Sequence, residues 1–309
     1  MISPLGLGIS ARRSFLGELS RRLSAGDASL CSQLGWVEIV PENFMGRGGH
    51  SRRALLEIAE RVSVSLHGVS LSIGGSDPLS SDYLSQLGNL ARDTRARWVT
   101  DHLCFSSHGG AQFQNLLPLP FTREAVRHVV SRVKEVQSYL GIPFGLENPS
   151  YYLQMPGAEM TEAQFFTEIL EQSDCQMLLD VNNVYLNSYN HVQTEGNRVQ
   201  AALAASRKFL RQLPLERMIE VHVAGYEERY LDDAETKPML LDSHGTPVSD
   251  PVKVLLQDLH ELRPIKTLLL ERESNVPTLD EIVREAAGLW NGLKRKQVSP
   301  FTESPGLSL

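Results

Sequence analysis

The sequence contains only three cysteines, Cys31, Cys104 and Cys175, in 309 residues. An odd number at wide spacing fits neither a disulfide framework nor a CxxC metal site, so each is predicted to be a small buried residue. Positive charge is also in deficit. The net charge of −7 argues against a broad surface for nucleic acid or anionic membranes.

Long hydrophobic runs are absent as well. No stretch of 18 apolar residues occurs, so no membrane-spanning segment is expected. The N-terminal sequence MISPLGLGISARRSF lacks the charged region and long apolar region of a signal peptide. A cytoplasmic protein with no membrane or nucleic-acid partner is therefore expected.

A glycine-rich phosphate loop is missing after the first apolar run, where GLGISARRS contains no GxGxxG. This counts against an open doubly wound sheet. Instead, short apolar runs alternate with longer helical segments, as in a (β/α)8 TIM barrel. The expected strands are 6–10, 36–40, 63–71, 97–103, 143–148, 176–181, 218–224 and 267–273.

The helical segments carry recognisable end signals. The segment 121–141 places apolar residues at i, i+3, i+4 and i+7 and ends at Gly141. The segments 160–173 and 277–296 open with Thr161 and Thr278 as N-caps. We expect one barrel domain over residues 1–296 and a flexible tail over residues 297–309.

Strand after strand ends in a residue type that binds metals. Because the C-terminal ends of barrel strands converge on one mouth, these side chains are predicted to meet there. Loops after the strands add three further candidates. The predicted ligands are His67, His102, Glu147, Asp180, His222 and Glu271 from strands, and His191, Asp242 and His244 from loops.

Crowded carboxylates repel one another unless cations neutralise them, which favours a metal site at this mouth. Nine ligands exceed the needs of one ion, so two or three ions are implied. Histidine and carboxylate without cysteine suit iron, manganese or zinc. Residues predicted to orient the ligands or contact substrate are Glu42, Asn43, Asn148, Asn182, Asn183 and Glu220.

An ordered series of motifs resembles the DUF692 family, the multinuclear non-haem iron-dependent oxidative enzymes (MNIO), which include the methanobactin-biosynthesis oxidase. The resemblance extends from about Gly6 to Glu273. It rests on PENFMG (41–46), LHGVSLSIG (66–74), TDHLCFSS (100–107), NLLPLPFT (115–122), LENPSYYL (146–153), LLDVNNVYLNSYNH (178–191), EVHVAGY (220–226) and DSHGTPV (242–248).

The resemblance implies a TIM barrel with two or three iron ions, of which a mixed-valence Fe2+/Fe3+ pair activates dioxygen. It implies the same nine ligands, with Asp242 and His244 also taking part in catalysis. The implied substrate is a ribosomally synthesised precursor peptide, oxidised at cysteine. A small partner protein that recognises the peptide's leader is implied too.

Three other functions use the same fold or ligand types. A metallohydrolase of the endonuclease IV type gathers a trinuclear zinc or manganese site at its strand ends and activates water. The scarcity of basic loops weighs against a DNA substrate. A sugar isomerase and a metal-sequestering protein without enzymatic activity are weaker alternatives.

Overall fold

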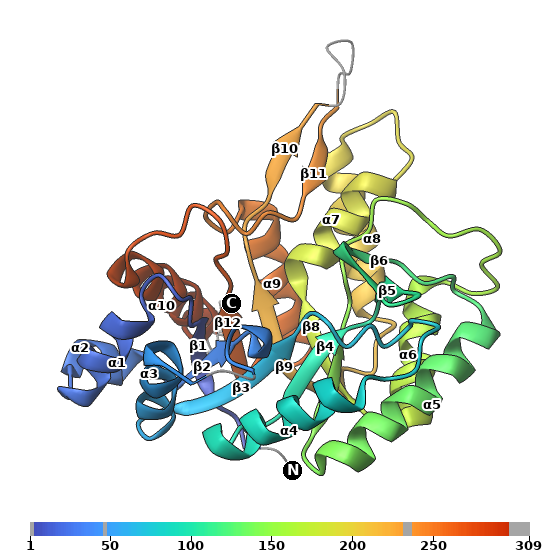
Figure 1. Ribbon diagram of the computed structural model, residues 1–309. Coiled ribbons are helices and arrows are strands. Elements are labelled where there is room, and N and C mark those ends of the chain that lie inside the picture. Colours follow the sequence, from blue (N-terminus) through green and yellow to red (C-terminus); the bar gives the residue numbers. More distant parts are fainter. Residues whose placement is uncertain (1–2, 46–47, 231–236, 297–309) are drawn as a thin grey trace, which may run out of the picture.

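The computed structural model of the protein describes residues 3–45, 48–230 and 237–296. Eight parallel strands close into a barrel, and neighbouring strands follow the order of the chain (Figure 1). The predicted (β/α)8 barrel is confirmed, and each predicted apolar run contains one strand. These strands are β1 (Gly6–Ser10), β2 (Trp36–Ile39), β3 (Ser63–Gly68), β4 (Val99–His102), β7 (Phe144–Glu147), β8 (Gln176–Asp180), β9 (Met218–Val223) and β12 (Thr267–Leu270). The predicted tail, residues 297–309, lies outside the described residues.

Helices surround the barrel, and the two with predicted N-caps begin as expected. The Thr161 hydroxyl accepts a hydrogen bond from Gln164 N while the Gln164 side chain accepts from Thr161 N. Thr278 forms the same box with Glu281. The helices are α1 (Leu16–Ser24), α2 (Ala28–Gln33), α3 (His50–Ala59), α4 (Ser81–Thr94), α5 (Arg123–Leu140), α6 (Glu162–Ser173), α7 (Val181–His191), α8 (Arg198–Leu210), α9 (Asp250–Leu262) and α10 (Leu279–Lys296).

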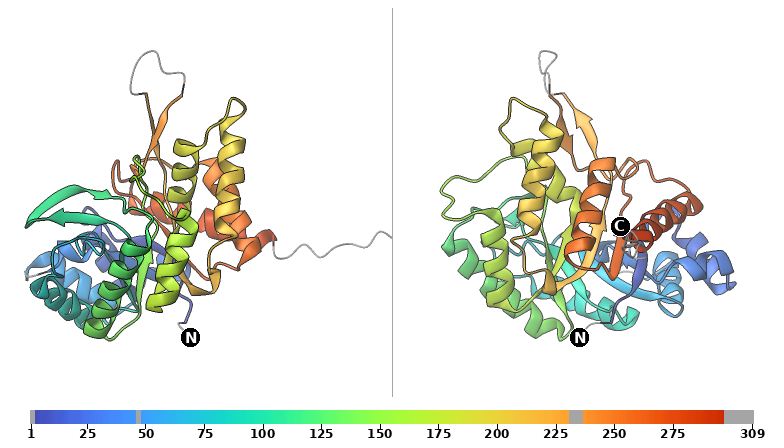
Figure 2. Two further views of the ribbon diagram at one scale, coloured as in Figure 1. Left: turned by 90° about the vertical axis from the view of Figure 1, so that its right-hand side faces the viewer. Right: turned by 180° about the vertical axis from the view of Figure 1, so that it is seen from behind.

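Two hairpins, which the sequence analysis did not predict, interrupt the βα alternation. One pairs β5 (Phe105–His108) with β6 (Ala111–Leu117), and the other pairs β10 (Glu227–Arg229) with β11 (Met239–Leu241). The second hairpin rises above the barrel beside α7 and α8 (Figures 1 and 2). The Asn190 side chain holds it there, donating to the Leu240 carbonyl over 2.9 Å and accepting from Leu240 N over 3.0 Å.

The barrel interior is built in layers, because alternate residues of each strand point inward. Two fully buried indoles, Trp36 and Trp98, lie 5.9 Å apart between ring centroids. Gly8 gives Trp36 its room, since a Cβ there would lie 2.3 Å from the indole ring. One inward position further along their strands lie Glu38 and Thr100, and above these lie the candidate ligands.

The structure can be compared with the predictions that the cysteines are buried and that no segment spans a membrane. Cys104 and Cys175 are buried, but Cys31 is exposed. The prediction was wrong for Cys31 because the short helix α2 buries only Leu30. Among the residues that the structure describes, no helix has the length and apolar character needed to cross a membrane.

Candidate metal centre

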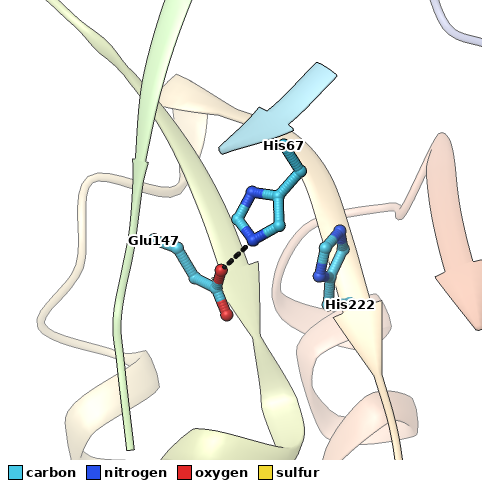
Figure 3. Close-up of side chains that lie close together, drawn as sticks. All are labelled: His67, Glu147 and His222. Carbon is cyan, nitrogen blue, oxygen red and sulfur yellow. Dashed lines mark ion pairs between the residues drawn. The ribbon is translucent and has the colours of Figure 1, made fainter. Parts of the chain in front are cut away.

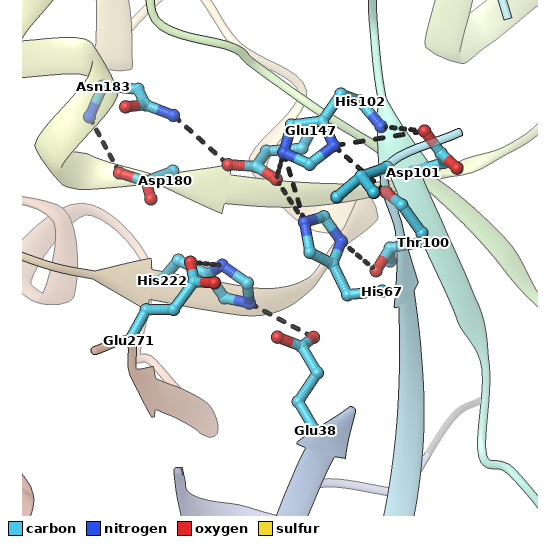
Figure 4. A network of polar contacts seen from close by, with 12 residues as sticks. Glu38, His67, Thr100, Asp101, His102, Glu147, Asp180, Asn183, His222 and Glu271 are labelled. Carbon is cyan, nitrogen blue, oxygen red and sulfur yellow. Dashed lines mark hydrogen bonds and ion pairs between the residues drawn. The ribbon is translucent and has the colours of Figure 1, made fainter. Parts of the chain in front are cut away.

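Eight of the nine predicted ligands converge at the C-terminal mouth of the barrel. Figure 4 shows those that were predicted from the strands. His102, Glu147 and Asp180 are the last residues of their strands, and His67 and His222 each stand one residue before a strand end. Glu271 follows β12 directly, and Asp242 follows β11. The eight residues are His67, His102, Glu147, Asp180, His222, Asp242, His244 and Glu271.

The first group consists of His67, His102 and Glu147. The two imidazole Nε2 atoms lie 3.3 Å apart, and Glu147 Oε2 lies 2.9 Å from the first and 3.2 Å from the second. His102 Nδ1 donates to the Gly68 carbonyl over 3.1 Å. Donation at Nδ1 leaves a lone pair on Nε2 of a neutral ring.

Thr100 fixes the tautomer of His67 in the same way. The Thr100 hydroxyl lies 3.5 Å from the Leu66 carbonyl, to which it donates, and accepts from His67 Nδ1 over 2.9 Å. Burial lowers the pKa of His67 and of His102 to about 4, so both rings are neutral at pH 7. Two imidazole lone pairs and a carboxylate oxygen therefore point at one another. Their mutual repulsion is relieved only when a proton or a cation lies between them.

The second group consists of Asp180, His222 and Glu271, whose ligand atoms lie within 4.8 Å of one another. His222 Nε2 donates to Glu220 Oε1 over 3.1 Å, and its Nδ1 lies 3.3 Å from Glu271 Oε2. Figure 3 shows His222 beside the pair of His67 and Glu147, so the first two groups adjoin.

The third group consists of Asp242 and His244, with Glu271 shared. His244 Nε2 lies 2.6 Å from Asp242 Oδ1, and His244 Nδ1 lies 3.5 Å from Glu271 Oε2. His244 has the left-handed φ of 49°, which costs free energy for a residue with a Cβ. Main-chain hydrogen bonds from His244 N to Gly225 O and from Glu273 N to His244 O hold that conformation.

The protonation states also indicate a site built for cations. Burial raises the pKa of Glu147 and raises that of Asp180 well above its usual range. Burial alone would lower the pKa of His222, but Glu38 and the other carboxylates around it raise it well above 6.5. Without metal, protons occupy this centre, and a divalent ion would take their place.

Buried polar atoms that lack a hydrogen-bond partner also indicate a cation site. Buried atoms without a hydrogen-bond partner include Glu147 Oε2, Asp180 Oδ2, His222 Nδ1 and His244 Nδ1. These atoms belong to predicted ligands, and Asn182 Oδ1 and Asn183 Oδ1 beside them also lack a partner. Each such orphan costs free energy, so their concentration at the mouth favours a cation there. Others lie elsewhere in the described residues: Glu42 Oε2, Ser106 Oγ, Ser249 Oγ and Arg272 Nε. The residues therefore fit a centre of two or three metal ions.

Comparison with known proteins gives the family. Residues 6–292 match the family described as "RiPP precursor modification enzyme MbnB/TglH/ChrH", where RiPP denotes a ribosomally synthesised and post-translationally modified peptide. The chain belongs to this family. The predicted resemblance to the DUF692 family is thereby confirmed, as is the modification of a precursor peptide as the class of function.

Relatives in other bacteria cover most of the chain. A UPF0276 protein of Shewanella loihica is 34% identical over 304 residues, which cover 98% of this chain and all of that protein. A UPF0276 protein of Neisseria meningitidis serogroup B is 37% identical, with 83% of this chain and 86% of that protein covered. One from an Anaeromyxobacter species is 41% identical, with 81% and 82% covered.

Solved structures share the fold alone. An L-ribulose 3-epimerase matches with a TM-score of 0.55 at 15% identity, covering 96% of this chain and 99% of that chain. A xylose isomerase-like TIM barrel protein from Mycobacterium smegmatis in complex with magnesium matches with a TM-score of 0.54 at 13% identity and the same coverage. At such identity, the function of this RiPP-modifying enzyme has to be argued from its own residues.

Most residues predicted to support the ligands contact them. Asn182 donates to Asp242 Oδ1 over 2.9 Å, and Asn183 donates to Glu147 Oε1 over 3.2 Å. Glu220 accepts from His222, as predicted from their spacing, and also from Trp98 Nε1 over 2.7 Å. Asn148 instead bonds both main-chain groups of Asp180 and so extends the pairing of β7 with β8.

Glu42 and Asn43 do not contact the ligands. Glu42 Oε1 accepts from Val69 N over 2.9 Å, from Ser70 N over 3.0 Å and from the Tyr83 hydroxyl over 2.7 Å. It therefore fixes the loop that follows β3. Asn43 is exposed at the end of a short 3-10 turn.

His191 lies apart from the other predicted ligands. The stretch expected to be a loop after β8 is the helix α7, whose eleven residues rise about 16 Å along its axis. His191 is its last residue, stacked on Tyr151 with ring centroids 4.8 Å apart and its Nε2 3.1 Å from the Tyr151 carbonyl. The helix removes it from the mouth that Asp180 reaches.

Three further residues of this family member contact the centre but were missed in the sequence. Glu38 Oε2 lies 3.4 Å from His222 Nε2. Arg12 lies 2.8 Å from Glu271 Oε1, leaving Oε2 for the centre. Asp101 accepts from His102 N over 2.7 Å. Only Glu38 could have been found from the sequence. It stands two positions after Trp36 in a buried strand, so the two side chains share the inward face.

Proposed function

We propose that this RiPP-modifying enzyme binds two or three iron ions and uses dioxygen to oxidise a precursor peptide at a cysteine. The observation that carries the proposal is the meeting of His67 Nε2, His102 Nε2 and Glu147 Oε2. Imidazole and carboxylate without thiolate suit iron, manganese and zinc. Zinc has no redox chemistry, so an oxidase requires one of the other two.

Each group of ligands would hold one ion. His67, His102 and Glu147 would hold the first. Asp180 and His222 would hold the second, and Asp242 and His244 the third, with Glu271 shared between them. Bound iron supplies the one-electron chemistry that couples peptide oxidation to reduction of dioxygen.

The chain's own residues orient the ligands. Asn183 occupies Glu147 Oε1, so that Oε2 faces the centre. Glu220 occupies His222 Nε2, so that Nδ1 faces the centre. Such outer contacts fix the ring orientation and the tautomer, and they reduce the reorganisation needed when an ion binds.

Asp242 and His244 are suited to hold and move a proton beside the substrate. Burial lowers the pKa of His244, but Asp242 and Glu271 raise it well above 6.5, so this ring is cationic at pH 7 in the absence of metal. Both side chains are partly exposed, at 17% and 11%, so a bound peptide could reach them. His244 Nε2 lies 2.6 Å from Asp242 Oδ1, so a proton on this nitrogen can be shared between the two side chains.

The remaining parts of the proposal concern partner and compartment. A small partner protein would recognise the leader of the peptide, because the described mouth is built around the metal centre rather than around a long binding groove. We place the reaction in the cytoplasm, where ribosomes release the precursor.

A trinuclear zinc or manganese hydrolase is the alternative that the same ligands allow. The test is metal content and dioxygen uptake of protein purified anaerobically after iron-supplemented expression, with a cysteine-containing precursor peptide encoded beside the enzyme. We expect two to three irons per chain and peptide-dependent uptake. His102→Ala should abolish the uptake, whereas His108→Ala, an exposed histidine of the β5–β6 hairpin, should leave it unchanged. Zinc with phosphodiester turnover and no uptake would overturn the proposal.

A further inference from the structure

A cavity of about 270 Å³ lies behind the loop that follows β7, among helices α6, α7 and α8. Its walls are apolar along Val184, Val192 and Phe209. Its polar end is formed by Glu162, Tyr151 and His191. The volume suits one extended side chain rather than a whole small-molecule substrate, for which pockets are typically larger than about 300 Å³.

Glu162 is the chemically distinctive residue of this cavity. Its Oε2 accepts from the Tyr151 hydroxyl over 2.8 Å, and its Oε1 accepts from Asn187 Nδ2 over a long 3.4 Å. Within residues 3–45, 48–230 and 237–296, no lysine or arginine forms an ion pair with it. The side chain is half-buried and has no counter-charge, and burial raises its pKa to about 7.

An aromatic wall adjoins this carboxylate. The rings of His191 and Tyr151 stack with centroids 4.8 Å apart and planes inclined by 23°. Aromatic faces attract cations, and they attract the planar guanidinium group in particular. The cavity thus combines apolar walls, an aromatic face and an unpaired carboxylate at one end.

Long basic side chains have the complementary form, with an apolar methylene stem and a cationic head. We propose that this cavity binds the side chain of an arginine or lysine of the precursor peptide and so anchors the peptide beside the metal centre. The inference deepens the proposed function, on whose peptide substrate it rests.

The loop after β7 connects the cavity to the metal centre. The Ser150 hydroxyl donates to Asp242 Oδ2 over 3.0 Å, and Asp242 N donates to the Tyr152 hydroxyl over 2.9 Å. Between these two residues, Tyr151 turns toward the cavity, with its amide bonded to Asn187 Oδ1 over 2.9 Å. A side chain bound in the cavity would therefore lie one residue of the loop away from the contacts of Asp242.

The test uses three capped tripeptides, acetyl-Gly-Arg-Gly-amide, acetyl-Gly-Lys-Gly-amide and acetyl-Gly-citrulline-Gly-amide, titrated calorimetrically into the full chain at pH 8. Citrulline keeps the shape of arginine and removes its charge. We expect saturable binding of the two basic peptides and binding of the citrulline peptide weaker by about tenfold or more, because it cannot pair with the carboxylate.

Variants locate the binding. Glu162→Gln should weaken binding of the arginine peptide by about tenfold or more, and Glu171→Gln, an exposed residue of the same helix, should not change it. Ala205→Phe, which fills the cavity from α8 and leaves Glu162 itself unchanged, should abolish binding. Equal affinity for arginine and citrulline, or arginine binding that survives both Glu162→Gln and Ala205→Phe, would overturn the inference.

These titrations are made without dioxygen, so they are independent of the oxidation chemistry. If the peptides bind but no dioxygen is consumed with a precursor peptide, the proposed oxidase function fails and the anchoring site stands. If dioxygen is consumed and the peptides do not bind, the anchoring site fails and the oxidase function stands.

Discussion

The Nε2 atoms of His67 and His102 lie 3.3 Å apart on neighbouring strands, and neither ring has a proton there to give the other. The Thr100 hydroxyl accepts a hydrogen bond from His67 Nδ1–H and so keeps the lone pair of Nε2 free for a ligand bond. Thr100→Val preserves the shape of the residue but removes this acceptor. We expect iron affinity of the first group to fall by about 10- to 100-fold, measured by chelator competition.

The matched control is Thr94→Val, a buried threonine whose hydroxyl bonds only within its own helix. It makes the same chemical change far from the centre and should leave iron affinity unchanged. Equal affinities in the two variants would show that Thr100 does not set the tautomer of His67.

Metal affinity should rise with pH. The pKa values of His222 and His244 are raised by the carboxylates around them, and burial raises those of Glu147 and Asp180. Each ion must displace protons held by these groups, so acid opposes binding. For Mn2+, used as a redox-stable probe, we expect about tenfold weaker binding per pH unit for each proton released, between pH 8 and pH 6. Affinity independent of pH would contradict the protonation states described above.

Glu162 should make the protein less stable as the pH rises. A salt-bridged carboxylate has the opposite effect, because its contribution is lost as the pH falls. Burial raises its pKa from 4.5 to about 7, so the folded state binds its proton more tightly than the unfolded state does. The favourable contribution is therefore complete below about pH 4.5 and is lost as the pH rises through 7. Glu162→Gln has no such loss. After discounting for partial exposure, we expect it to gain about 1–2 kcal/mol over the parent protein between pH 5 and pH 8 in urea unfolding.

Asn190 should determine whether the β10–β11 hairpin stays against α7. Asn190→Ala removes both hydrogen bonds to the main chain of Leu240, and we expect a loss of about 1–2 kcal/mol, at about 1 kcal/mol for each bond. Hydrogen exchange at the Leu240 amide should accelerate, and Gln200→Ala, an exposed helix residue, should leave it unchanged. Unchanged exchange in Asn190→Ala would mean that β10 pairing alone holds β11.

The barrel was predictable because its signals are local and repeated. Buried parallel strands such as Gln176–Asp180 are continuous apolar runs, and caps such as Thr161 mark where helices begin. The two hairpins were not predicted, because β10 and β11 are only three residues long and β10 is fully exposed. Too few apolar residues alternate in them to give a periodic signal.

The candidate site was predictable to the extent that strand ends converge. His191 was grouped with the other ligands because NSYNH was expected to be a loop, and its asparagines favour that interpretation. Asp180 overrides them by capping α7, and the helix then fixes the position of His191. Arg12 follows β1 without any pattern of its own, and only the closure of β1 against β12 brings it to Glu271.

The two carboxylate oxygens of Asp180 have different roles, one in starting a helix and one at the candidate metal centre. Oδ1 accepts from Asn183 N over 2.8 Å and starts α7, while Oδ2 has no partner and faces the cluster. If a descendant of this protein lost its catalytic role, selection on the helix start would still retain an aspartate at this position. The His102 ring contacts the other ligands through Nε2 and bonds the Gly68 carbonyl through Nδ1, but it starts no helix and would have no comparable protection. In such a lineage, replacement of His102 would therefore mark the loss of catalysis. Asp180 would be retained after catalysis is lost.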